Sequence, residues 1–336
     1  MPPYYDSRVT GTNHLARTAV LGIAILLHAG GSAAQSAAQK YPAQTINVVA
    51  ATSPGGGVDL MARVVAQKLT DMGARSIVVN KPGGSGIIGF EFAAKAAPDG
   101  YTLLLASGGF ATNQFMYDKL PYDVERDFAP VVFVGYIPLI LVAHPSFPPN
   151  SVRELIALAK AKPGQVQIAN GSSGSGGALS GVLLNHLARI DVAFIPYKGN
   201  APALNALVGG HVSAMFDTLT TSLPFVQAGR LKALAVTSAK RSSFAPEYPT
   251  MIEAGLPTFD VTAWYMLFAP KKTPHDIVLK LNADLNKAFS DSDLAKRMSG
   301  QGIDLIGGTP EQAEAHVQAE FTRWGPLIRA AGIKGE

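Results

Sequence analysis

Three glycine-rich turns are the segments of this sequence whose residue types and spacing could do chemistry. They are Ser53-Pro54-Gly55-Gly56-Gly57-Val58-Asp59, Gly83-Gly84-Ser85-Gly86 and Gly171-Ser172-Ser173-Gly174-Ser175-Gly176-Gly177. Glycine lets the backbone approach a ligand closely, and the free N–H groups at the start of a helix attract an anion. One such turn can be no more than a tight connection between two elements. Three of them in one chain indicate a cleft that binds a small anion.

The turns lack the signatures of nucleotide sites. None of them ends in the Gly-Lys-Ser/Thr of a Walker loop. The segment from Gly84 to Gly89 matches G-x-G-x-x-G, but the next expected strand ends in Ala106-Ser107-Gly108-Gly109, without an acidic side chain for a ribose. We therefore expect neither nucleoside triphosphate hydrolysis nor a dinucleotide, and no cofactor.

Motifs for catalysis and for metal binding are also missing from the sequence. There is no G-x-S-x-G elbow, and the seven histidines are scattered without H-E-x-x-H spacing. Cysteine is absent, which excludes thiolate nucleophiles, disulfides and a lipoprotein anchor. We expect no catalytic residue and no metal site, although acid–base pairs formed only in space leave an exported enzyme as an alternative.

The composition describes a compact globular protein of one or two units. Of the 336 residues, 47% are hydrophobic and 15% are charged. The net charge is +4, but lysine and arginine are scattered rather than clustered beside aromatic residues. We therefore expect no nucleic-acid partner.

The N-terminus resembles a secretory signal peptide. Arg8 and Arg17 precede the apolar run Ala19 to Leu27, which is followed by small residues up to Ala34. The apolar run has nine residues, far fewer than the roughly 20 that span a bilayer. We predict that residues 1–34 are a signal peptide, with cleavage after Ala34 or Ala38, and that the mature chain is periplasmic.

From Tyr41 onward, β-rich runs alternate with helical stretches, which predicts doubly wound α/β lobes. Val131 to Val134 and Leu139 to Ala143 are expected to be two strands separated by Pro138. The run Val261 to Ala269 is expected to return to the first lobe. We predict that lobe 1 contains residues 41–143 and 264–336, that lobe 2 contains residues 144–263, and that a two-strand hinge joins them.

The mature chain resembles the Bug-type, or tripartite tricarboxylate transporter, extracytoplasmic solute receptors. The matching stretches are TSPGGGVDLMARVVAQKL, VVNKPGGSGIIGFEFAAKAAPDGYTLL, LPYDVERDFAPV, IPYKGNAPALNALVGGHVSAMFD, GRLKALAVTSAKR, WYMLFAP and TPEQ. The resemblance implies a type II periplasmic-binding-protein fold and a monomer. It also implies a small carboxylate ligand, held by backbone amides and waters, and delivery to an integral-membrane permease.

The resemblance also implies which residues bind the ligand. In lobe 1 they are Ser53, Pro54, Gly55, Gly56, Gly57 and Asp59, with Ser107, Gly108, Gly109, Phe110 and Ala111 at the next strand end. In lobe 2 they are Asn170, Ser172, Ser173, Gly174, Ser175, Tyr197, Lys198 and Gly199. Asp217 and Trp264 would face the distal part of the ligand. Asp217 could instead cap the following segment, Trp264 could be hinge core, and Lys198 could simply be solvated.

One departure from the family pattern bears on the ligand. Small residues follow the lobe 2 turn at Ser175 to Ala178, and Phe110 follows Gly108-Gly109. We hypothesise that these residues admit an aromatic or bulkier carboxylate. A periplasmic sensor that docks on a signalling receptor is an alternative to a transport receptor.

Overall fold

A computed structural model describes residues 41–172 and 174–335, and the chain from Pro42 onward forms one compact unit. The predicted signal peptide and Ser173 lie outside the described residues. Within them, ten strands form one sheet. The strands are β1 Ile46–Ala50, β2 Ser76–Asn80, β3 Thr102–Ala106, β4 Phe128–Ala143, β5 Gln167–Asn170, β6 Ala193–Pro196, β7 Ala214–Thr218, β8 Lys232–Val236, β9 Thr262–Pro270 and β10 Asp304–Gly307.

Helices connect most of these strands. They are α2 Gly57–Asp71, α3 Ile87–Ala94, α4 Gly108–Thr112, α5 Val124–Asp127, α6 Val152–Ala161, α7 Gly176–Ala188, α8 Asn200–Val208, α9 Leu219–Gln227, α10 His275–Phe289, α11 Ser292–Ser299 and α12 Pro310–Ala330, with short 3-10 turns at Gly84–Gly86 and Asn113–Phe115. None of the helices in the described part of the chain has both the length and the apolar character needed to cross a membrane.

The strand β4 belongs to two regions of the sheet. Its residues Phe128 to Pro138 pair with β9, and its residues Leu139 to Ala143 pair with β7 and β8. The first sheet region therefore contains β1, β2, β3, β9, β10 and the start of β4, and the second contains β5 to β8 and the end of β4. The prediction of two separate strands was wrong, because Pro138 lies inside one long strand, still in register with β9.

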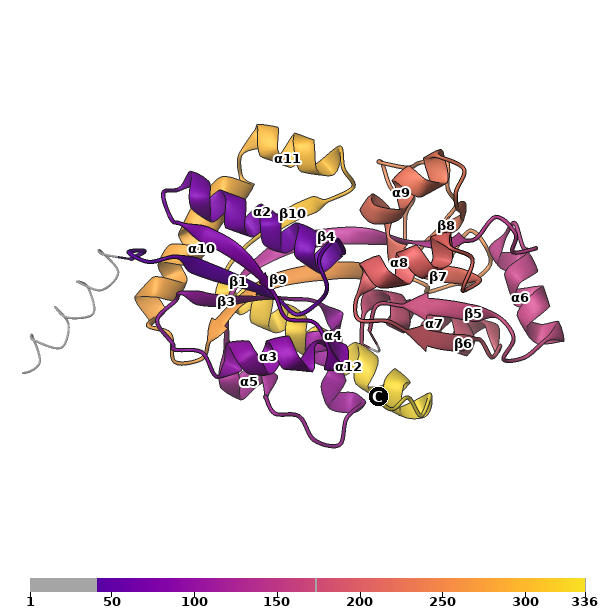
Figure 1. Ribbon diagram of the computed structural model, residues 1–336, viewed down its shortest axis with the longest axis horizontal. Helices are drawn as coiled ribbons and strands as arrows, with labels where there is room; N and C mark the ends of the chain where they lie inside the picture. The colour runs from indigo at the N-terminus through magenta and orange to yellow at the C-terminus, as the bar shows by residue number, and fades with distance from the viewer. Residues whose placement is uncertain (1–40, 173, 336) are drawn as a thin grey trace, which may run out of the picture. The chain divides into compact units, whose positions relative to one another are not determined.

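Helices cover both faces of the first sheet region, with α2 and α10 on one face and α3 and α12 on the other (Figure 1). Apolar residues recur on the buried side of these helices, as Met61, Val65 and Leu69 do along α2. The helix α12 begins with a capping box formed by Thr309 and Gln312. It packs against β4 and α4 and also contacts α7 of the second region.

Each sheet region has a hydrophobic core of its own. In the first region, the aromatic rings of Phe90, Phe110, Phe128 and Phe268 pack together beside β3 and β9. In the second, residues of α8 and α9 pack on one face of β4, β5 and β7, with Leu204, Met215 and Leu223 among the buried members. The aromatic ring of Phe110 is therefore in the core, and its exposed fraction is 0%.

Parallel pairing decides where the glycine turns lie. In the first region β1 is parallel to β2 and β3, and in the second β5 is parallel to β6 and β7. The turns after β1, β3 and β5 therefore leave the carboxyl ends of strands, which is where open α/β sheets bind ligands. The predicted glycine turn at residues 83–86 follows β2 and does not line the cleft described below.

Candidate functional site

A cleft of about 620 Å³ lies where these turns meet. Both sheet regions line it, and so do Pro138 of β4 and Thr262 and Ala263 of β9, at the point where the two regions join. The first residues of three helices also line it, namely Gly57 of α2, Gly176 of α7 and Asn200 of α8. The positive ends of three helix dipoles therefore point at one cavity.

Turns from the two regions touch each other directly. The hydroxyl of Ser53 donates a hydrogen bond to the carbonyl oxygen of Lys198 at 2.6 Å, and the Ser53 N–H donates to the same oxygen at 3.3 Å. A second contact joins the hydroxyl of Thr112 to the carbonyl oxygen of Gly174 at 3.3 Å. The turns thus converge around the cleft, and the two regions are in contact across it.

Two glycines in these turns allow approaches that a side chain would prevent. A Cβ atom on Gly57 would overlap the hydroxyl oxygen of Tyr265 and lie 2.9 Å from Cγ2 of Thr218. A Cβ atom on Gly171 would overlap Oδ1 of Asn200 and lie 2.8 Å from its backbone nitrogen. A side chain at Gly57 would have to displace Tyr265 or Thr218, and one at Gly171 would have to displace Asn200.

Some of the predicted site residues line the cleft itself: Gly56, Gly57, Ser107, Gly108, Ser172, Ser175 and Trp264. The others lie around it. Ser53, Lys198 and Gly199 form the contact between the two regions, and Gly109 lies against Gly174. Pro54 and Gly55 lead into α2, Asn170 ends β5, and Tyr197 packs against the second core. Phe110 and Ala111 are enclosed in the first core, so the Phe110 ring does not form a cleft wall.

Asp59 supports its turn from behind the cleft. Its carboxylate accepts hydrogen bonds from the Gly55 N–H at 3.0 Å, from Arg63 Nε at 2.9 Å and from Asn80 Nδ2 at 3.0 Å. Burial would raise the pKa of Asp59, but these hydrogen bonds outweigh it and lower the pKa. Asp59 therefore remains ionised and fixes the shape of the turn without facing the cavity.

Asp217 is completely buried beneath the second wall of the cleft. It accepts hydrogen bonds from Asn200 Nδ2 at 2.7 Å and from the hydroxyls of Thr221 and Ser222 at 2.6 and 2.7 Å. Burial raises its pKa, and these hydrogen bonds only partly offset the effect. Asp217 thus orients Asn200, which lines the cleft, and ties the first turn of α9 to β7.

Sequence reasoning missed a polar cluster on α12 and β4 at the other side of the cleft. Glu320 is 8% exposed, and its Oε2 accepts hydrogen bonds from Trp264 Nε1 at 2.7 Å and Trp324 Nε1 at 3.1 Å. His316 and Tyr136 line the cavity beside it. The signal was present, because Ala313, Val317, Glu320 and Trp324 follow the i, i+4, i+7, i+11 spacing of a buried helix face.

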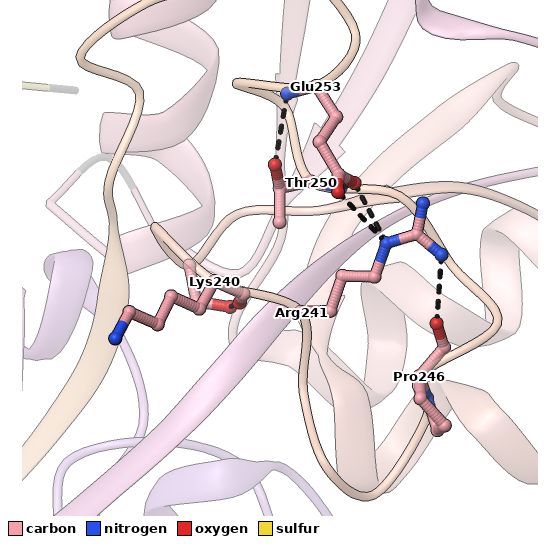
Figure 2. A network of polar contacts seen from close by, with 6 residues as sticks. Lys240, Arg241, Pro246, Thr250 and Glu253 are labelled. Carbon is pink, nitrogen blue, oxygen red and sulfur yellow. Dashed lines mark hydrogen bonds and ion pairs between the residues drawn. The ribbon is translucent and has the colours of Figure 1, made fainter.

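Basic side chains lie along the edge of the cleft. Arg241 is held by Glu253, whose Oε2 lies 2.9 Å from Nε, and it donates to the carbonyl oxygen of Pro246 at 3.0 Å. Figure 2 shows the Lys240 side chain pointing away from this network. Arg323 donates to the carbonyl oxygen of Asp260 and lies over the Trp324 ring, 4.8 Å from its centre. Acidic residues line the cleft as well, namely Asp260, Asp304 and Glu320, so its lining carries charges of both signs.

A family model described as the tripartite tricarboxylate transporter family receptor matches residues 61–333. The chain belongs to this family. It is 38% identical to the protein BugT of Bordetella pertussis over 315 residues, an alignment that covers 93% of this chain and 97% of BugT. The type of fold and the resemblance predicted from the sequence are thereby confirmed.

Solved structures of this receptor family include complexes with small carboxylates. One from R. palustris with adipate superposes with a TM-score of 0.85 at 32% identity, covering 88% of this chain and 99% of that one. MatC from Rhodopseudomonas palustris with bound malate gives a TM-score of 0.81 at 33% identity, covering 86% and 100%. Proteins of this family are periplasmic solute-binding receptors rather than enzymes, as the sequence predicted for this chain.

Proposed function

We propose that this protein is a periplasmic receptor that captures a small carboxylate in the cleft and delivers it to the membrane subunits of a tripartite tricarboxylate-type transporter. The observation that supports this most is the meeting of glycine turns from both sheet regions in one cavity. The carboxylate complexes of the similar structures point to the same class of ligand.

Affinity would come from main-chain donors and helix dipoles. The N-termini of α2, α7 and α8 supply N–H groups that their own helices leave unpaired. A charged acceptor strengthens such hydrogen bonds to about 1.5–3 kcal/mol each. A carboxylate placed between the turns would bridge the two regions and hold them together.

The lobe boundaries and the hinge belong to this proposal. Lobe 1 would contain residues 41–143 and 264–336, and lobe 2 would contain residues 144–263. β4 and β9 would act as the hinge, because the chain passes between the two sheet regions along these strands. Export would use residues 1–34 as a signal peptide, and the mature receptor would work as a monomer.

Binding can be tested on mature protein that has been unfolded and refolded to remove retained ligand. We expect mono-, di- or tricarboxylates to raise the melting temperature, and matched neutral amides not to do so. A ligand at one hundred times its Kd adds about 2.7 kcal/mol of stability. If no carboxylate in the panel stabilises the protein, the proposed function fails. Mass analysis of the ligand after incubation should recover it unchanged, and an altered ligand would indicate an enzyme.

Delivery needs a separate test. The ligand-bound receptor should co-purify with the membrane subunits of a tripartite tricarboxylate-type transporter, and the ligand-free receptor should do so less. Retention by the extracytoplasmic domain of a signalling kinase instead would contradict delivery and would indicate a sensor.

A further inference from the structure

Glu320 presents one carboxylate oxygen to the cleft. Both of its hydrogen bonds, from the indole N–H groups of Trp264 and Trp324, go to Oε2. Oε1 has no hydrogen-bond partner among the described residues. It is also not enclosed, because it is absent from the set of buried side-chain atoms that lack a partner. Since Glu320 lines the cleft, Oε1 is the oxygen that faces it.

No cation of the described chain is paired with this carboxylate. The nearby guanidinium of Arg323 donates to the carbonyl oxygen of Asp260 and lies over the ring of Trp324. None of the ion pairs among the described residues includes Glu320. A carboxylate that is 8% exposed and half satisfied is costly in the folded protein. A partner that arrives from the cleft would remove part of that cost.

Aromatic side chains packed around Glu320 hold it in place and shield it from most of the solvent. The His316 ring packs against Trp264, Tyr136 and Phe133, with centroid distances of 5.6, 6.0 and 4.9 Å. Burial lowers the pKa of His316 and raises that of Glu320. This wall of the cleft is therefore aromatic and contains a carboxylate acceptor held in place, whereas the opposite walls consist of turns rich in N–H donors.

We infer that Oε1 of Glu320 forms a second subsite, which accepts a hydrogen bond from a hydroxyl or ammonium group of a ligand whose carboxylate lies at the glycine turns. The inference rests on the proposed function and narrows the ligand class. The preferred ligands are small carboxylic acids that carry a hydroxyl or amino substituent. An unsubstituted analogue leaves Oε1 unpaired, and sites built around a buried polar partner discriminate strongly against such analogues.

The test is a calorimetric titration with matched sets of probes. Each set contains an unsubstituted dicarboxylate and its hydroxy and amino derivatives, such as succinate, malate and aspartate, and the corresponding sets with five and six carbons. In the wild-type protein we expect the substituted members of at least one set to bind tenfold or more tightly than the unsubstituted one. Within that set, the derivative with the higher affinity shows whether a hydroxyl or an ammonium group is the preferred donor to Oε1.

The matched variant is Glu320→Gln. Its amide oxygen can keep both indole hydrogen bonds, while its NH₂ group replaces the acceptor in the cleft with a donor. The preference for substituted ligands should fall to near unity. Amino ligands should lose more affinity than hydroxy ligands, because a hydroxyl can also accept. The exposed Glu314 of the same helix provides the control, and Glu314→Gln should leave every ratio unchanged.

The outcomes separate this inference from the proposed function. If carboxylates bind but the wild-type ratios are near unity, or if Glu320→Gln keeps the wild-type ratios, the subsite is refuted while the proposed function stands. If no carboxylate binds, the proposed function itself fails. Because the wild-type ratios need no variant, a Glu320→Gln protein that does not fold still leaves the inference testable.

Discussion

Three buried carboxylates lie around the cleft, and their surroundings give them different tasks. Asp59 is paired with Arg63, and its lowered pKa keeps it charged behind the first turn. Asp217 has only neutral donors around it, so burial prevails and its pKa is raised. Burial also raises the pKa of Glu320, whose hydrogen-bond partners are two indole N–H groups. Residue type alone would not distinguish these three roles.

Substitution of Asp217 tests how its raised pKa affects the stability of the fold. The pKa of Asp217 in the folded protein lies above its ordinary value of 3.8. Asp217 therefore contributes its full stabilisation below about pH 3.8, and this stabilisation is lost as the pH rises through the folded-state pKa. Asp217→Asn lacks the charge but keeps an acceptor for Asn200. We expect its stability relative to wild type to increase between about pH 4 and pH 7, as measured by urea unfolding.

Asp217→Ala is the contrasting variant. It leaves Asn200, Thr221 and Ser222 without their common acceptor, so we expect a loss of about 2–4 kcal/mol at both pH values. If Asp217→Asn and Asp217→Ala are equally unstable, or if the stability difference between Asp217→Asn and wild type does not change with pH, this account of Asp217 is wrong.

At the level of elements, turns and periodic segments were predictable from the sequence. The predicted alternation of β-rich runs and helical stretches corresponds to strands and helices such as β1, α2 and β2. The strand order was not predictable, because β4 and β9 pair across more than a hundred residues of sequence. The helix α9 was missed since Pro224 lies within it, and β10 has only four residues.

The candidate site was predictable only where backbone recognition leaves a glycine signature. Gly56, Gly57, Gly108 and Ser175, which were predicted from such turns, line the cleft. Glu320 and Tyr136 were missed because long-range folding of α12 onto β4 brings them to the cavity. Phe110 was expected in a cleft wall, but the apolar residues around it place its ring in the core.

Neighbouring glycines of the first turn should differ sharply in their tolerance of alanine. Gly57→Ala would bring a methyl group against Thr218 and Tyr265, whereas a Cβ on Gly56 would lie 3.4 Å from Asn200 Cβ, an ordinary contact. Gly56 also has φ −94°, which any residue adopts. Overpacking costs about 1–3 kcal/mol, so Gly57→Ala should weaken carboxylate binding roughly 5- to 150-fold. Isothermal titration of both variants checks this, and equal affinities would contradict the close approach.

At the level of the whole molecule, the two sheet regions are held together at several separate places. Besides the contact between Ser53 and Lys198, the hydroxyl of Thr220 donates to the carbonyl oxygen of Gln301 at 2.8 Å, and Phe244 packs against Gly302. All of these contacts join the second region to the first across the cleft. In the proposed function, ligand entry would require these contacts to separate.

A pair of cysteines can report this separation, because the chain has none of its own. The Cβ positions of Gly56 and Asn200 are 3.4 Å apart in this arrangement, close to the spacing of about 3.5–4.5 Å in disulfides. In Gly56→Cys/Asn200→Cys we expect a saturating carboxylate to accelerate disulfide formation, followed by gel mobility and thiol labelling. The single-cysteine variants are the controls. Identical rates with and without ligand would argue against closure.

The hydrogen bonds of Glu320 also have an optical consequence. The chain contains two tryptophans, and the indole N–H groups of both donate to the same oxygen. All of the intrinsic tryptophan fluorescence of this protein thus originates around one carboxylate in the wall of the cleft. Proton uptake by that carboxylate, or the docking of a guest against it, changes the electric field at every emitter in the molecule, so the protein carries a label-free reporter of its own occupancy.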